Sequence, residues 1–138
     1  MIDLAVQIAL RARLVASPDV TVDVPPDAIL DRNARPAPTP GIVMGEAQVI
    51  DVSEIDLDHR RSRVTHTLHI WQRSQSREGV KRIMGAMRAA ILPGRLDLGP
   101  ELHAVQTRVT QMRALSDPDG ETAHGVLTVE ILVEELAP

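Results

Sequence analysis

The chain has 138 residues, a net charge of −4 at pH 7, 43% hydrophobic residues and 25% charged residues. It contains no cysteine, which excludes disulfides, thiolate metal sites and cysteine nucleophiles. Its single aromatic residue, Trp71, cannot supply the stacking surfaces that proteins binding single-stranded nucleic acids use. The longest stretch without a charged residue is the ten residues 36–45, whereas a membrane span needs about 20 apolar residues. These counts predict one soluble domain over residues 1–138, stabilised by aliphatic packing and without a signal peptide.

Residues 2–16 are predicted to form a helix of about four turns, because their apolar residues recur at helical spacing. Its buried stripe is expected to consist of Leu4, Ile8, Ala12 and Val15, with Ala5, Ala9 and Ala16 beside it. The tripeptide at 17–19, Ser-Pro-Asp, should end this helix because proline disfavours its continuation. Alternating valines then indicate a short strand over residues 20–24. A proline-rich loop follows at 25–41, for which a role in binding or assembly and a role as a simple connection are both open.

Two strands and a helix are predicted in the middle of the chain. Residues 42–52 and 64–72 should pair as an antiparallel hairpin joined by a polar connection. In the second strand one face should carry Val64, Leu68 and Ile70, and the other Thr65, Thr67 and Trp71. The helix that follows carries its apolar stripe at Val80, Ile83, Met84, Met87 and Ile91. Ser74 or Ser76 should cap its start, and Pro93-Gly94 should end it.

Two further strands complete the predicted fold. Residues 102–115 form a long strand of mixed polarity, and the turn chemistry of residues 116–120 leads into the last strand. That strand should bury Leu127, Val129, Ile131 and Val133. The resulting order α-β-β-α-β-β predicts an α+β fold, with an antiparallel β-sheet and helices packed on one face.

No pattern in the sequence indicates a catalytic or metal site. The chain has five histidines: His59, His66, His69, His103 and His124. His66 and His69 are three residues apart on a strand and therefore point to opposite faces. His103 and His124 should lie at opposite ends of the last hairpin, roughly 30 Å apart. Nucleophile elbows and glycine-rich phosphate loops are absent from the sequence, so we expect no enzyme activity, cofactor or metal.

Charge is unevenly distributed along the chain. Residues 73–95 hold six basic residues and one acid, a net +5, which leaves −9 for the rest of a chain whose total is −4. A basic helix in an acidic domain is typical of a solvated outer face, or of a contact with an acidic strand of another copy. Under the second interpretation the candidate subunit-interface residues are Arg60, Arg61, Arg63, Trp71, Glu130 and Glu134. Sequence-specific DNA binding is disfavoured by the negative net charge and the missing reader motif.

The layout resembles a known family over nearly the whole chain. The second strand of the predicted hairpin has the sequence VTHTLHIWQR at residues 64–73. The helix that follows has the sequence SREGVKRIMGAMRAAIL at 76–92, and the last strand has the sequence GVLTVEILVEE at 125–135. This order, preceded by an N-terminal helix and a proline-rich stretch, resembles the tail-terminator (tail-completion) proteins of long-tailed phages and phage-like gene transfer agents.

The resemblance implies a structural virion protein without catalysis, cofactor, metal or membrane contact. Proteins of this family form a hexameric ring that caps the finished tail tube, ends its polymerisation and joins it to the head connector or stopper protein. DNA passes through the ring without sequence-specific binding, and the implied location is the host cytoplasm during assembly and then the virion neck. Two alternatives stay open: another neck or head-closure ring protein, and a small cytoplasmic α+β dimer that binds a ligand.

Overall fold

The computed structural model describes residues 1–31, 38–54 and 60–136. Its elements in chain order are α1 (Ile2–Val15), α2 (Pro18–Thr21), the 3-10 turn η1 (Pro26–Ala28), β1 (Ile29–Leu30), β2 (Gly41–Asp51), β3 (Arg61–Arg73), α3 (Glu78–Ile91), β4 (Leu102–Ser116) and β5 (Thr122–Glu135). The five strands form one sheet in the order β1-β2-β3-β5-β4. The chain therefore has the predicted α+β fold.

The sheet differs from the predicted one at its β1 edge. β1 pairs parallel with β2, whereas β2–β3, β3–β5 and β4–β5 pair antiparallel, so the sheet is mixed. The elements α2, η1 and β1 are additions to the predicted order α-β-β-α-β-β. The extra strand arises inside the segment 25–41, which was predicted to be a loop, because Ala28 and Ile29 are buried there. Residues 32–37 of that loop lie outside the described residues.

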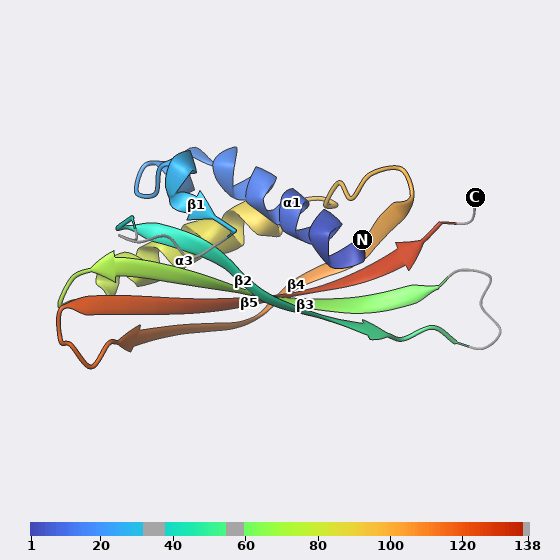
Figure 1. Cartoon of the computed structure of the whole chain (residues 1–138). Helices are drawn as coiled ribbons and strands as arrows, with labels where there is room; N and C mark the ends of the chain where they lie inside the picture. The colour runs from blue at the N-terminus through green and yellow to red at the C-terminus, as the bar shows by residue number, and fades with distance from the viewer. Residues whose placement is uncertain (32–37, 55–59, 137–138) are drawn as a thin grey trace.

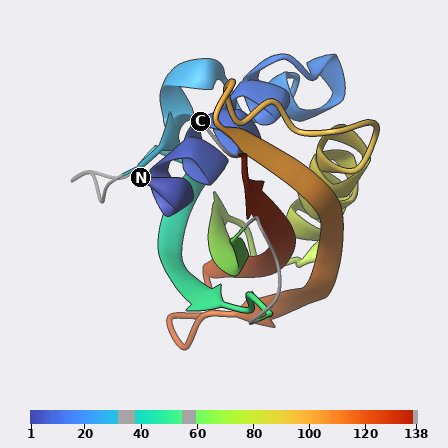
Figure 2. The same cartoon turned by 90° about the vertical axis from the view of Figure 1, so that its right-hand side faces the viewer.

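The helices lie on one side of the sheet, as Figure 1 shows. α1 and α3 cover that side, and none of the described helices covers the opposite side, which we call the helix-free face. Figure 2 shows the sheet strongly twisted, with β2 and β4 curving around the central strands β3 and β5. Register shifts in β2 and β4 are consistent with this shape, because bulges increase local twist. Within the described part of the chain, no helix is long and apolar enough to span a membrane.

The core lies between the helices and the two central strands. Alternate residues of β3 and β5 point into it, as expected for strands with one covered face. The fully buried positions include Val64, Leu68 and Ile70 of β3 and Leu127, Val129, Ile131 and Val133 of β5. The predicted inward faces of both strands are therefore confirmed.

α3 matches its prediction in its buried stripe and in its end, whereas the predicted serine N-cap is wrong. Its buried residues are Val80, Ile83, Met84, Met87 and Ile91. At its start the backbone N–H of Glu78 donates to Ser76 Oγ over 3.1 Å, although Arg77 takes the N-cap position. At its end Gly94 adopts a φ of +66°, a left-handed conformation that favours glycine after a helix.

The buried stripe predicted for α1 is wrong, although the helix itself is present. The side chains that α1 buries are Val6, Ala9, Leu10 and Leu14. Leu4 is instead 52% exposed and Ile8 is 61% exposed. Because α1 is apolar on more than one side, periodicity alone does not fix which side faces the sheet. Arg13 helps to fix the rotation of α1 about its axis. Its guanidinium donates to the carbonyls of Ile91 and Pro93 at the C-terminal end of α3, over 3.1 and 2.6 Å.

The strand predicted over residues 20–24 is wrong, because this segment consists of the end of the short helix α2 and the turn that follows it. The backbone N–H of Val20 donates to Ser17 Oγ over 3.4 Å, and Pro18 occupies the first turn, where its missing N–H costs no hydrogen bond. Val20 and Val24 are buried, whereas Val22, which a strand would place on the same face, is exposed. The tripeptide that ends α1 therefore also starts α2.

Candidate functional site on the helix-free face

Ion pairs join β3 and β5 at one end of the helix-free face. Arg61 Nε lies 2.9 Å from a carboxylate oxygen of Glu134, and Arg63 Nε lies 3.3 Å from one of Glu130. The register places Arg61 directly opposite Glu134, while Glu130 is opposite Thr65, so Arg63 reaches it diagonally. These basic and acidic side chains therefore meet within one chain.

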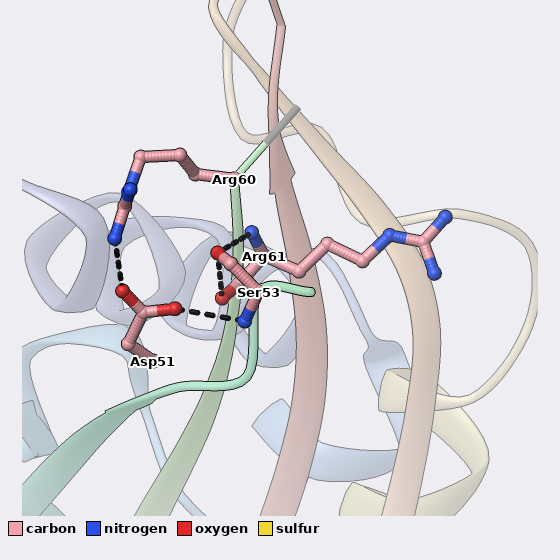
Figure 3. A network of polar contacts seen from close by, with 4 residues as sticks. All are labelled: Asp51, Ser53, Arg60 and Arg61. Atoms are coloured by element: carbon pink, nitrogen blue, oxygen red, sulfur yellow. Dashed lines mark hydrogen bonds and ion pairs between the residues drawn. The ribbon is translucent and has the colours of Figure 1, made fainter. Parts of the chain in front are cut away.

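A hydrogen-bond network closes the β2–β3 hairpin beside these ion pairs, as Figure 3 shows. The backbone N–H of Arg61 donates to Ser53 Oγ over 2.8 Å, and the Ser53 hydroxyl donates to the carbonyl of Arg61 over 3.2 Å. Asp51 accepts the Ser53 N–H over 2.8 Å and pairs with the Arg60 guanidinium. The bond from the Ser53 N–H is the largest of the contacts that lower the pKa of Asp51. In Figure 3 the side chains of Arg60 and Arg61 extend to opposite sides of this network.

The candidate interface residues lie along the helix-free face or at its margin. Arg61, Arg63 and Trp71 occupy alternate positions of β3, Glu130 and Glu134 occupy alternate positions of β5, and Arg60 directly precedes β3. The structure brings the arginines and glutamates together at one end, whereas Trp71 lies toward the other end of β3. A contact of these residues with another copy stays a prediction.

The other end of the helix-free face holds a cluster of two histidines, a tryptophan and a carboxylate, which we call the His–Trp cluster. Its members are Glu46 of β2, His69 and Trp71 of β3, and His124 of β5. Nδ1 of His69 lies 2.9 Å from Nε2 of His124, and Nε2 of His69 lies 3.2 Å from a carboxylate oxygen of Glu46. The Trp71 ring stacks on the His124 ring, with centroids 3.8 Å apart and planes inclined by 7°. The four side chains thus form a continuous series of contacts.

Strand register and one glycine bring the His–Trp cluster together. Trp71 and His124 are directly opposite each other in the β3–β5 ladder. Gly45 lies at a bulge of β2, where an added Cβ would be 2.7 Å from His69 Cδ2 and 2.7 Å from the carbonyl oxygen of Thr67. Because backbone cannot yield at such a contact, the imidazole of His69 needs glycine beside it.

A cavity of about 520 Å³ opens beside the His–Trp cluster and is also lined by Asp31 and Val43. Burial, and after it the neighbouring His69, lowers the pKa of His124, so this imidazole is neutral at pH 7. The backbone N–H of Glu46 and the bond from His69 lower the pKa of the Glu46 carboxyl. The cavity is therefore bordered by an ionised carboxylate and a neutral imidazole.

The histidines are arranged partly as predicted. His66 faces the core and His69 the helix-free face, which confirms their opposite orientations. His103 and His124 lie toward opposite ends of the β4–β5 hairpin, also as predicted. The contact between His69 and His124 was missed, because it depends on the register between two strands distant in sequence. His59 lies outside the described residues; among those described, no group of three or more His, Asp or Glu side chains is arranged to hold a metal ion.

His66 is a buried polar group within the apolar core. It has 0% exposure, and neither ring nitrogen has a hydrogen-bond partner among the described residues. Burial lowers the pKa of His66, and the nearby Thr67 backbone, followed by the negative charges of Asp3 and Glu46, opposes this effect only in part. The folded chain therefore holds His66 neutral and pays a desolvation penalty for two unpaired nitrogen atoms.

We expect the substitution His66→Leu to stabilise the chain by about 1 kcal/mol at pH 7, because it removes an unpaired polar group at similar volume. The unfolded chain binds the His66 proton more readily than the folded chain does. The wild type should therefore keep its full stability above the ordinary histidine pKa and lose part of it as the pH falls below that value. Urea unfolding at several pH values should show a flatter dependence for His66→Leu, and a loss of stability at pH 7 would contradict this account.

The basic surface predicted from the charge distribution lies on α3, on the side of the molecule away from the helix-free face. Its exposed members are Arg77, Lys81, Arg82 and Arg88. Arg82 pairs with Asp23, which follows α2, over 3.5 Å. Beside the ion-paired Arg61 and Arg63, the helix-free face also carries the exposed Arg108 and Arg113 of β4, so both faces of the subunit present basic side chains.

Comparison with known proteins identifies the fold and the family. A family model described as Tail completion protein gp17 matches residues 8–134. A chain in the virion of a native gene transfer agent particle is similar in structure, with a TM-score of 0.84 and 16% identity over 96% of this chain and 97% of that chain. The gp17 protein of bacteriophage SPP1 is also similar, with a TM-score of 0.63 and 19% identity over 97% of this chain and 90% of that chain. A sequence comparison with curated proteins finds no match.

The two structural similarities are at low sequence identity and establish a shared fold. The family match is a separate observation on the sequence, and it spans β2, β3, α3 and β4 completely. These are elements that build both faces of the subunit. The chain therefore belongs to the tail completion protein gp17 family.

Proposed function

We propose that the chain is a tail terminator, which forms a hexameric ring that caps the finished tail tube and ends its polymerisation. The observation that carries this proposal is the family match over residues 8–134. The similarity to a chain of a gene transfer agent virion supports it. We place the protein in the virion neck, between the tail-tube protein and the head connector or stopper protein, after assembly in the host cytoplasm.

A ring of identical subunits needs two different surfaces on each copy that fit each other around a closed circle. A head-to-tail contact that does not close would instead propagate into a filament. The basic α3 on one side and the net negative remainder of the chain supply opposite charges, which favour contact between unlike surfaces. The proposed ring contact includes Arg60, Arg61, Arg63, Trp71, Glu130 and Glu134.

In this proposal DNA passes through the ring without sequence-specific binding. Tight binding of duplex DNA requires several Lys or Arg side chains that are free to neutralise phosphates. The whole chain has a net charge of −4, which disfavours tight binding of a polyanion. The role requires neither catalysis nor a cofactor.

Tail assembly without this chain tests the proposal. We expect tail tubes to grow past their normal length and to fail to join heads, and we expect added purified chain to restore both. Negative-stain electron microscopy measures tail length and the fraction of joined particles. Tails of normal length in the absence of the chain would contradict a terminator function. Binding to isolated head connectors but not to tails would indicate a head-closure protein instead.

A further inference from the structure

We propose that His69 and His124 form a binding site for a divalent transition-metal ion of the zinc, nickel and copper class. Imidazole nitrogen is a preferred ligand of these ions. Two imidazoles face each other here, with 2.9 Å between His69 Nδ1 and His124 Nε2. The inference goes beyond tail termination and rests on the His–Trp cluster alone.

The separation of the two nitrogens is close to what one ion requires. A zinc–nitrogen bond is about 2.0–2.1 Å long, so two nitrogens on one tetrahedral ion lie about 3.4 Å apart. The observed 2.9 Å has to widen by about 0.5 Å. Because the two rings meet end to end, with centroids 5.2 Å apart, each ring also has to turn so that its lone pair points at the ion. With the His69 proton on Nε2, toward the Glu46 carboxylate, the donor in the free pair is the His124 Nε2–H and the acceptor is His69 Nδ1. On binding, His124 carries its proton on Nδ1, and its Nε2 lone pair becomes a ligand.

The neighbours of the two histidines hold them in position for binding. Glu46 accepts a hydrogen bond from Nε2 of His69 over 3.2 Å, which leaves Nδ1 free as a ligand. A carboxylate in this place is the usual outer partner of a metal-bound histidine, because it fixes the tautomer and the ring orientation. Trp71 stacks on His124, and the space above Gly45 is filled by the His69 ring. These contacts keep both rings close to the orientation that binding requires.

The adjoining cavity of about 520 Å³ leaves room for the water molecules that complete the coordination of the ion. Two nitrogen ligands favour zinc, nickel and copper over magnesium and calcium, which prefer oxygen. Because the described residues supply two ligands rather than four, we expect weaker binding than at a closed structural zinc site. Copper should bind most tightly of the three ions.

The fluorescence of Trp71, the single tryptophan, reports ion binding at this site, because the Trp71 ring is in contact with the His124 ring. We would titrate the full chain with Cu²⁺ and Ni²⁺, which quench tryptophan fluorescence at short range, and measure Zn²⁺ binding by calorimetry. The test variants are His69→Ala, His124→Ala and the double variant, each checked for folding by circular dichroism. His103→Ala is the matched control, because it removes another half-exposed histidine at the far end of the sheet. If an alanine variant does not fold, we would use asparagine at the same position, that is His69→Asn or His124→Asn.

We expect saturable quenching with one ion per chain, and recovery of the fluorescence when Zn²⁺ displaces Ni²⁺. Each single substitution at His69 or His124 should weaken binding about tenfold or more, Glu46→Ala should weaken it about tenfold, and His103→Ala should leave it unchanged. Equal affinity in the wild type and the double variant would overturn the proposal. Absence of both quenching and heat of binding in the wild type would overturn it as well.

Discussion

Replacing Ile131 with aspartate is expected to unfold the chain. Ile131 is fully buried in the C-terminal half of β5, between Val64 of β3 and Thr107 of β4. A carboxylate at this position would replace an apolar side chain in a core of aliphatic residues. An unpaired buried charge costs about 3–5 kcal/mol or more, whereas a domain is stable by only about 5–15 kcal/mol.

Circular dichroism and urea unfolding check this expectation. The Ile131→Asp variant should show no cooperative transition, or one at a much lower urea concentration than the wild type. The control is Thr128→Asp on the same strand, because Thr128 lies on the helix-free face opposite Thr67 and keeps contact with water. A soluble Ile131→Asp variant with cooperative unfolding near that of the wild type would show that the account of the core is wrong.

The double charge reversal Arg60→Glu/Arg61→Glu is expected to abolish ring assembly while the subunit stays folded. Arg60 pairs with Asp51 at the exposed margin of the helix-free face, and Arg61 forms a partly buried pair with Glu134. Surface ion pairs and like charges opposite each other on neighbouring strands change the free energy of unfolding by about 1 kcal/mol each, so the variant should be less stable but still folded. In a ring the same change would be repeated at every contact between copies, where like charges repel.

Sedimentation of the purified variant and electron microscopy of capped tails measure this effect, and urea unfolding verifies the fold. The matched control is Arg95→Glu/Arg113→Glu, which changes the net charge equally at exposed positions that belong neither to α3 nor to the proposed contact residues. Intact rings of the Arg60→Glu/Arg61→Glu variant would refute the interface. Equal loss of rings in both variants would show that total charge, rather than these two residues, governs assembly.

The parts of the fold that the sequence predicted well are those with one unambiguous periodicity. In β5 strict alternation placed Ile131 in the core, and in α3 a single narrow stripe placed Met84 and Met87 against the sheet. α1 is apolar on several sides, so its rotation depends on a tertiary contact, the capping of α3 by Arg13. Val22 was misassigned because alternating valines suit a strand, whereas Ser17 and Pro18 provide a stronger local signal for a helical turn.

The candidate site was less predictable than the fold. That Trp71 faces away from the core follows from the alternation of β3, and the structure confirms this orientation. Its partner His124 could not be identified from the sequence, because their contact requires the register of two strands that are not neighbours along the chain. The bulge at Gly45 that makes room for His69 is likewise a property of strand pairing.

The central claim is that this chain closes into a ring at the end of the tail tube. Its most direct test is a three-dimensional reconstruction, by electron microscopy, of tails capped with the purified chain. The account predicts a closed ring of this chain at the head-proximal end of each tube, with Arg60 and Arg61 between adjacent copies. Copies distributed along the tube, or an open filament of the chain, would contradict it.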